Sequence, residues 1–177
     1  WPDAPSILKD FSSRREELKQ QTALWTKTWY DDSSLPHWLM QRPLTHATSL
    51  VTDTSYRLTD YAGRFHFYEG VACCPGNCTH VWSYAQAVAF LFPEIERECR
   101  RTDLKTGMRP GGQIRMRWTA PNAPDAIDGS SGVILRVLRE HRMSTDRKFL
   151  DELWPETRTA ADYLIKAYDK NRDGVAD

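Results

Sequence analysis

The residues from Phe65 to Trp82 contain the chain's densest group of side chains that could carry out chemistry. Glu69 stands between Tyr68 and Gly70, in a segment crowded with aromatic residues just before a predicted helix. Sugars stack on aromatic rings, and cleavage of a glycosidic bond needs carboxylates beside that bond. Two interpretations follow: Glu69 acts on a glycoside, or it caps the next helix while the aromatic side chains belong to the core.

The same segment holds side chains that zinc prefers as ligands. They are Cys73, Cys74, Cys78 and His80, and Glu69 could join them. Adjacent cysteines fit one tetrahedral site poorly, and no second cysteine pair follows at zinc-finger spacing. The alternative to a zinc site is free thiols. Free thiols are typical of a reducing compartment, so we expect a cytoplasmic protein.

Two further acidic segments are candidates for binding. The run from Asp169 to Gly174 matches the opening of a calcium loop, with oxygen ligands at Asp169, Asn171 and Asp173. Such turns also end helices without an ion, so we expect either no cofactor or calcium here. Asp128 stands at the end of a long connection that is rich in Gly and Pro. There it could bind a ligand hydroxyl or cap a helix that begins at Ser130.

The elements that must position these residues are predicted to be helices, because apolar residues recur at helical spacing nearly throughout. The predicted helical stripes are Leu18 to Trp29, Met40 to Val51, Val81 to Leu91, the segment after Pro93, Ser130 to His141, and Asp146 to Tyr168. Residues 60–77 and 107–128 are predicted to be loops. Arg136, Arg139, Glu140, His141 and Arg142 are predicted to form a solvated face of paired charges. The fold class is therefore all-α.

Taken in order, several motifs resemble the catalytic domain of glycoside hydrolase family 116, which includes non-lysosomal glucosylceramidase and microbial β-glucosidases. The resemblance covers Leu35 to the last residue. Its parts are Gly63-Arg64-Phe65, Tyr68-Glu69-Gly70, Asn77 to Tyr84, Leu91-Phe92-Pro93-Glu94, Asp128, Leu135 to Arg139, Ser144-Thr145-Asp146, Phe149-Leu150, Trp154-Pro155 and Asp169 to Gly174. Each motif is weak alone, but their ordered series is specific.

The resemblance implies part of an (α/α)6 toroid of helical hairpins that acts as a retaining exo-β-glycosidase. It makes Glu69 the nucleophile and places the acid/base Asp after residue 177. It implies that Tyr68, Thr79, His80 and Asp128 contact the sugar. The chain departs from the family twice, because His80 stands where the family commonly has Asp, and Ile127 stands where the family has His. These departures leave the preference for glucose less secure than glycoside hydrolysis itself.

Composition limits the partners that we expect. The formal net charge is zero, which gives no electrostatic reason to bind nucleic acid, and no apolar run is long enough to span a membrane. We expect residues 1–177 to be the N-terminal portion of one catalytic domain, with a linker helix over 1–34. A full ring needs roughly twice this length, so we expect these residues to associate with the rest of the domain or with a second copy. The other expected partner is the β-glycoside substrate. The alternatives are a zinc-dependent glycosidase and a non-catalytic sugar-binding or scaffold protein.

Overall fold

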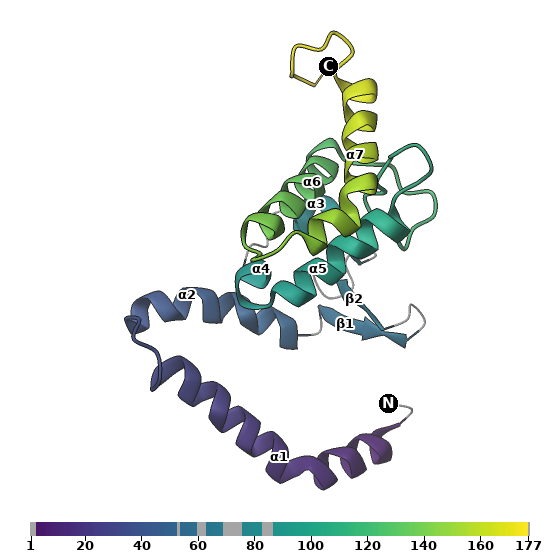
Figure 1. Cartoon of the computed structure of the whole chain (residues 1–177). Coiled ribbons are helices and arrows are strands. Elements are labelled where there is room, and N and C mark those ends of the chain that lie inside the picture. Colours follow the sequence, from purple (N-terminus) through teal and green to yellow (C-terminus); the bar gives the residue numbers. More distant parts are fainter. Residues whose placement is uncertain (1–2, 53, 60–62, 69–75, 83–86, 177) are drawn as a thin grey trace. The chain divides into compact units, whose positions relative to one another are not determined.

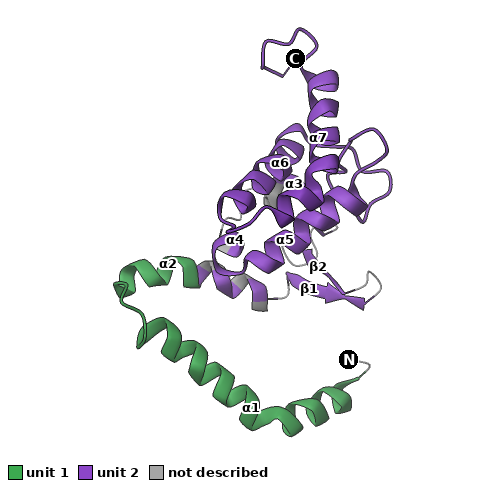
Figure 2. Ribbon diagram, viewed as in Figure 1, with its two compact units in different colours: residues 1–44 green, residues 45–177 purple. Residues whose placement is uncertain are grey.

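The computed structural model describes the chain apart from residues 1–2, 53, 60–62, 69–75, 83–86 and 177 (Figure 1). The described residues are predominantly helical, which confirms the predicted helical class. They fall into two compact units, residues 1–44 and residues 45–177 (Figure 2). No helix in the described part of the chain combines the length and the apolar character needed to cross a membrane.

The first unit contains α1 (Ala4–Tyr30) and most of α2 (His37–Ala47). Helix α1 begins after Asp3, whose carboxylate accepts a hydrogen bond from the backbone N–H of Ser6 at 2.8 Å. A side-chain acceptor of this kind satisfies one of the unpaired donors of a helix start. No residue of α1 is buried, although the helix carries large apolar side chains such as Leu8 and Leu24.

The second unit opens with a short 3-10 turn, Thr48–Val51, and a hairpin of two strands, β1 (Ser55–Leu58) and β2 (Arg64–Phe67). The strands are antiparallel, and their register pairs Ser55 with Phe67 and Leu58 with Arg64. The prediction of a loop over residues 60–77 was therefore wrong for β2. Four residues are too few for alternating polarity to be distinguished from an irregular segment.

The remaining helices of this unit are α3 (Thr79–Trp82), α4 (Ala87–Leu91), α5 (Pro93–Thr102), α6 (Ile127–Arg142) and α7 (Lys148–Tyr168). Helix α5 continues into a π-helical turn, η3 (Asp103–Gly107). Helices α6 and α7 pack as a hairpin, and α5 contacts α6. The apolar core lies among these elements and comprises Leu104, Ile114, Val133, Val137, Phe149, Leu153 and Ala160.

The connection from Met108 to Ala126 contains no helix, as its composition predicts. It is nevertheless tied to α7. Gly112 has a φ of +103°, and a Cβ atom there would lie 2.2 Å from the backbone oxygen of Thr159. Asp125 accepts hydrogen bonds from the Gln113 amide and the Tyr168 hydroxyl, both at 2.8 Å. The connection can thus hold the start of α6 in place.

Candidate functional site

The start of α3 is held on two sides by hydrogen bonds. The side chain of Asn77 accepts from the backbone N–H of Phe67 and donates to the carbonyl of Phe65, each at 2.7 Å, so it continues the edge of β2. Asn77 itself has a φ of 61°, a conformation that asparagine tolerates better than most residues. On the other side, the backbone N–H of Thr79 donates to Met116 in the long connection at 2.9 Å.

The first turn of α6 lies against this segment at Gly129. A Cβ atom on Gly129 would lie 2.5 Å from the Thr79 hydroxyl and 2.8 Å from the His80 backbone nitrogen. Only a glycine allows this approach. It brings the Asp128 carboxylate into hydrogen-bond contact with Nδ1 of His80, and both side chains stay accessible to solvent, at 51% and 46% exposure.

Three of the four predicted sugar-contacting residues therefore come together: Thr79, His80 and Asp128. Thr79 is buried, while His80 and Asp128 form the accessible part of the site. The prediction that α6 begins at Ser130 was wrong. The helix begins at Ile127, so Asp128 lies in its first turn, where a negative charge is favoured by the helix dipole.

The other predicted site residues are placed differently. Tyr68 is half-buried, and its ring packs edge-on against Tyr56 and beside His66. The predicted nucleophile, Glu69, and the cysteines Cys73 and Cys74 lie outside the described residues. The role of Glu69 therefore stays a prediction.

The predicted calcium ligands lie in the turn after α7. The carboxylate of Asp169 accepts from the backbone N–H of Gly174 at 3.2 Å, and the Asn171 side chain accepts from that of Asp173 at 3.1 Å. The oxygen atoms thus stabilise the turn itself. Within the described ranges, no group of three or more His, Cys, Asp or Glu residues is arranged to hold a metal ion, and calcium stays a prediction.

The two described cysteines, Cys78 and Cys99, are buried free thiols. Burial raises the pKa of Cys99, because the thiolate would lose its hydration. Cys78 forms an isolated β-bridge with Arg117 in the long connection. These two thiols have the character of packed core groups.

The prediction of a solvated charged face on α6 was wrong for Arg136 and Glu140, which are 4% and 0% exposed. They face α5 and η3, where Glu96, Arg100 and Asp103 are also buried. The Arg100 guanidinium lies 3.1 Å from Asp103, and the Arg139 guanidinium lies 2.8 Å from Glu96. The sequence did not predict this cluster, because charged residues are usually exposed and were therefore expected to face solvent.

Burial and neighbouring charges shift the pKa values in this cluster in different directions. Burial and the charge of Arg100 together lower the pKa of Arg136 to about 10. Burial alone would also lower the pKa of Arg100, but Glu96 and Asp103 raise it overall. Burial raises the pKa of Glu140, and the neighbouring Glu96 adds to this effect. The cluster therefore contains strong ion pairs beside charged groups that burial disfavours.

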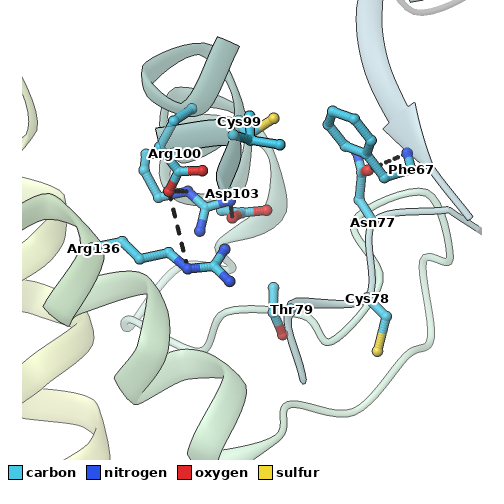
Figure 3. A pocket seen from close by; sticks show the side chains of 10 residues that line it. Phe67, Asn77, Cys78, Thr79, Cys99, Arg100, Asp103 and Arg136 are labelled. Atoms are coloured by element: carbon cyan, nitrogen blue, oxygen red, sulfur yellow. Dashed lines mark hydrogen bonds and ion pairs between the residues drawn. The ribbon is translucent and has the colours of Figure 1, made fainter. Parts of the chain in front are cut away.

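Figure 3 shows a small cavity next to this cluster, bounded on the opposite side by Phe67, Asn77, Cys78 and Thr79. Thr79 thus lines the cavity together with the buried charges, and it directly precedes His80 of the His80–Asp128 pair. When the chain is compared with models of known protein families and with curated protein sequences, neither comparison finds a significant match.

Proposed function

We propose that this chain is part of a retaining β-glycosidase, in which the carboxylate of Glu69 attacks a terminal β-linked sugar. The observation that carries the proposal is the pairing of His80 with Asp128, which are 48 positions apart in the sequence. An imidazole and a carboxylate that meet at an accessible helix start can hydrogen-bond neighbouring hydroxyl groups of one sugar ring. These are positions at which the resemblance expects contacts to the sugar.

In the proposed reaction, the ionised Glu69 carboxylate forms a bond to the anomeric carbon as the bond to the leaving oxygen breaks. A carboxylic acid donates its proton to that oxygen. Water then attacks the glycosyl-enzyme, the same residue takes a proton from the water, and Glu69 is released as a carboxylate. The resemblance assigns the acid/base role to an Asp after the turn at residues 169–174, and we give the role neither to Asp173 nor to Asp177.

The proposal includes the architecture. We assign the helices of residues 45–177 to part of an (α/α)6 toroid, whose hairpins would place the starts of alternate helices around one active site. Two observations support this assignment: the predominance of helix, and the α6–α7 hairpin with a short connection. The location of His80 and Asp128 at helix starts fits a site built from such ends.

The test is labelling with 2,4-dinitrophenyl 2-deoxy-2-fluoro-β-glucoside. Dinitrophenolate leaves without needing a proton, so the reagent tests the nucleophile separately from the acid/base. We expect one 2-fluoroglucosyl group on the peptide that contains Glu69, detected by mass spectrometry, and no label on Glu69→Gln. Glu94→Gln is the matched control, because the Glu94 side chain is 79% exposed and lies in the first turn of α5.

The rate of labelling should also depend on the pairing of His80 with Asp128. Asp128→Asn keeps the size of the side chain but removes its charge, so we expect roughly tenfold slower labelling, equivalent to about 1.4 kcal/mol. A label mapped to another residue, or a Glu69→Gln protein that labels at the normal rate, would overturn the proposal. Stoichiometric zinc whose removal abolishes labelling would favour the zinc-dependent alternative instead.

A further inference from the structure

Charged side chains of α5, η3 and α6 form one cluster. It comprises four arginines, Arg97, Arg100, Arg136 and Arg139, and three carboxylates, Glu96, Asp103 and Glu140. A fourth carboxylate, the exposed Glu94, pairs with Arg97 at 3.2 Å, so the charges of the four arginines are balanced. Burial raises the pKa of Asp103, although Arg100 opposes this effect. Any protonation of Asp103 would leave one arginine charge unbalanced.

Several guanidinium nitrogens of the cluster lack an acceptor. Among the residues that the structure describes, Nε and Nη1 of Arg100 and Nε and Nη2 of Arg136 are buried without a hydrogen-bond partner. Each of these side chains is only 5% exposed. Leaving buried N–H groups of a charged side chain unsatisfied costs more than a neutral hydrogen bond contributes. The two arginines therefore need an acceptor that the described protein groups do not supply.

The nearest carboxylate does not meet this need. Oε1 of Glu96 lies 3.6 Å from Nε of Arg100 and 4.0 Å from Nε of Arg136, beyond hydrogen-bond distance. The same oxygen instead accepts from Nη2 of Arg139 at 2.8 Å. Asp103 lies 3.1 Å from Nη2 of Arg100, a different nitrogen from the two that lack a partner.

Arg100 and Arg136 both line the cavity described above, and Figure 3 shows the guanidinium of Arg136 extending into it toward Thr79. The cavity has a volume of about 20 Å³, which is room for one or two waters. Phosphate, sulfate and organic carboxylates are larger than this. The cavity thus combines unsatisfied cationic donors with space for a monatomic ion.

We propose that this cavity binds one chloride ion between the N–H groups of Arg100 and Arg136. Chloride is only slightly larger than water. It accepts hydrogen bonds from any direction, so it does not require the donors to have a fixed geometry. Its weak hydration also suits a wall that contains Phe67, Val88 and the Cys78 thiol, and Glu96 and Asp103 line the cavity beside the two arginines. A bound ion would tie α5 to α6 beside Thr79, whether or not the protein acts on sugars.

Thermal unfolding of the whole chain tests the proposal, with sodium chloride and sodium gluconate compared at equal ionic strength. A ligand that binds only the folded state stabilises it by mass action. We therefore expect a melting temperature that rises with chloride and with bromide, and that rises less with gluconate, which is too large for the cavity. Equal melting temperatures in chloride and gluconate would overturn the proposal and leave water as the occupant.

Chloride NMR line broadening gives a direct measurement. We expect the protein to broaden the chloride signal and bromide to reverse the broadening by competition. Arg136→Lys keeps the charge but removes the guanidinium donors, so it should abolish both the broadening and the chloride-dependent shift. Arg147→Lys is the matched control, since the Arg147 side chain is 71% exposed.

The two measurements decide between the outcomes. If Arg136→Lys folds and broadens chloride as strongly as the wild type, the ion binds elsewhere and the proposal is wrong. If Arg136→Lys fails to fold, the wild-type signal decides, and the absence of broadening that bromide can reverse would overturn the proposal.

Discussion

Gly129 shows how a residue without a side chain can determine the geometry of a site. The contact between the start of α6 and the start of α3 leaves no room for a Cβ atom, which would lie 2.5 Å from the Thr79 hydroxyl. This approach places Asp128 beside His80. A glycine that follows an Asp at a helix start is as typical of a turn as of close packing between helices. The sequence pattern alone therefore did not identify the close packing.

Gly129→Ala should therefore separate α3 from α6. We expect a loss of roughly 1–3 kcal/mol in the free energy of unfolding, as for other overpacked sites, measured from urea denaturation midpoints. The His80 imidazole signals should also shift in NMR spectra as the contact with Asp128 is lost. Because alanine favours helix more than glycine does, a Gly129→Ala protein of equal or greater stability would contradict the packing described here.

The helices α5 and α6 show which part of the buried cluster the sequence could have predicted. On α5 the buried residues include Glu96, Cys99 and Arg100, followed by Asp103 at the start of η3. On α6 they include Val133, Arg136, Val137 and Glu140. Both sets follow the spacing i, i+3, i+4, i+7, which marks the buried face of a helix. The spacing alone predicts that these charged residues are buried, whereas their residue type predicts that they are exposed to solvent. The pattern of one helix also cannot show that a second stripe of charged residues faces it.

The ion pairs of Glu152 join α7 to α5 and η3. Its carboxylate accepts from Arg101 at 2.9 and 2.8 Å and from Lys105 at 2.9 Å. The hydrogen bonds from Arg101 are the main cause that lowers the pKa of Glu152 from 4.5 to about 2. A carboxylate with a lowered pKa in the folded state stabilises that state above its unfolded pKa, and this stabilisation is lost as the pH falls.

We therefore expect Glu152 to stabilise the protein above about pH 4.5, and to lose this effect as the pH falls toward about 2. The side chain is 33% exposed, so solvent screening limits the contribution to about 1 kcal/mol or less. Urea denaturation should show that Glu152→Gln is less stable than the wild type near neutral pH, and that this difference shrinks in acid. Asp162→Asn, which removes an exposed charge from the same helix, controls for net charge. A difference that stays constant with pH would contradict the assignment.

At the scale of the whole molecule, helical periodicity predicted the class of fold because long amphipathic helices repeat one signal many times. The two short strands gave no such signal. The meeting of His80 with Asp128 follows from tertiary packing through Asn77, Met116 and Gly129, which no local pattern encodes. The resemblance to a family supplied the candidate residues, and the structure then brought together three of the four that were expected to contact the sugar.

The second unit exposes large apolar side chains on its last two helices. Leu135 and Trp154 are 64% and 54% exposed, and Leu138 and Ile165 are 40% and 48% exposed. Apolar side chains at such positions favour association when they form a large patch. We expect residues 1–177 to self-associate, with a sedimentation coefficient that rises with protein concentration.

Replacing Leu135 and Trp154 together by Glu should weaken this association, because each charge would have to be desolvated in the contact. Both side chains are mostly exposed, so the stability of the monomer should change by no more than about 1 kcal/mol. Arg158→Gln changes a side chain on α7 that is 72% exposed, and it tests whether charge alone alters sedimentation. A wild-type chain that sediments as a single monomer at every concentration would show that these apolar side chains do not mediate self-association.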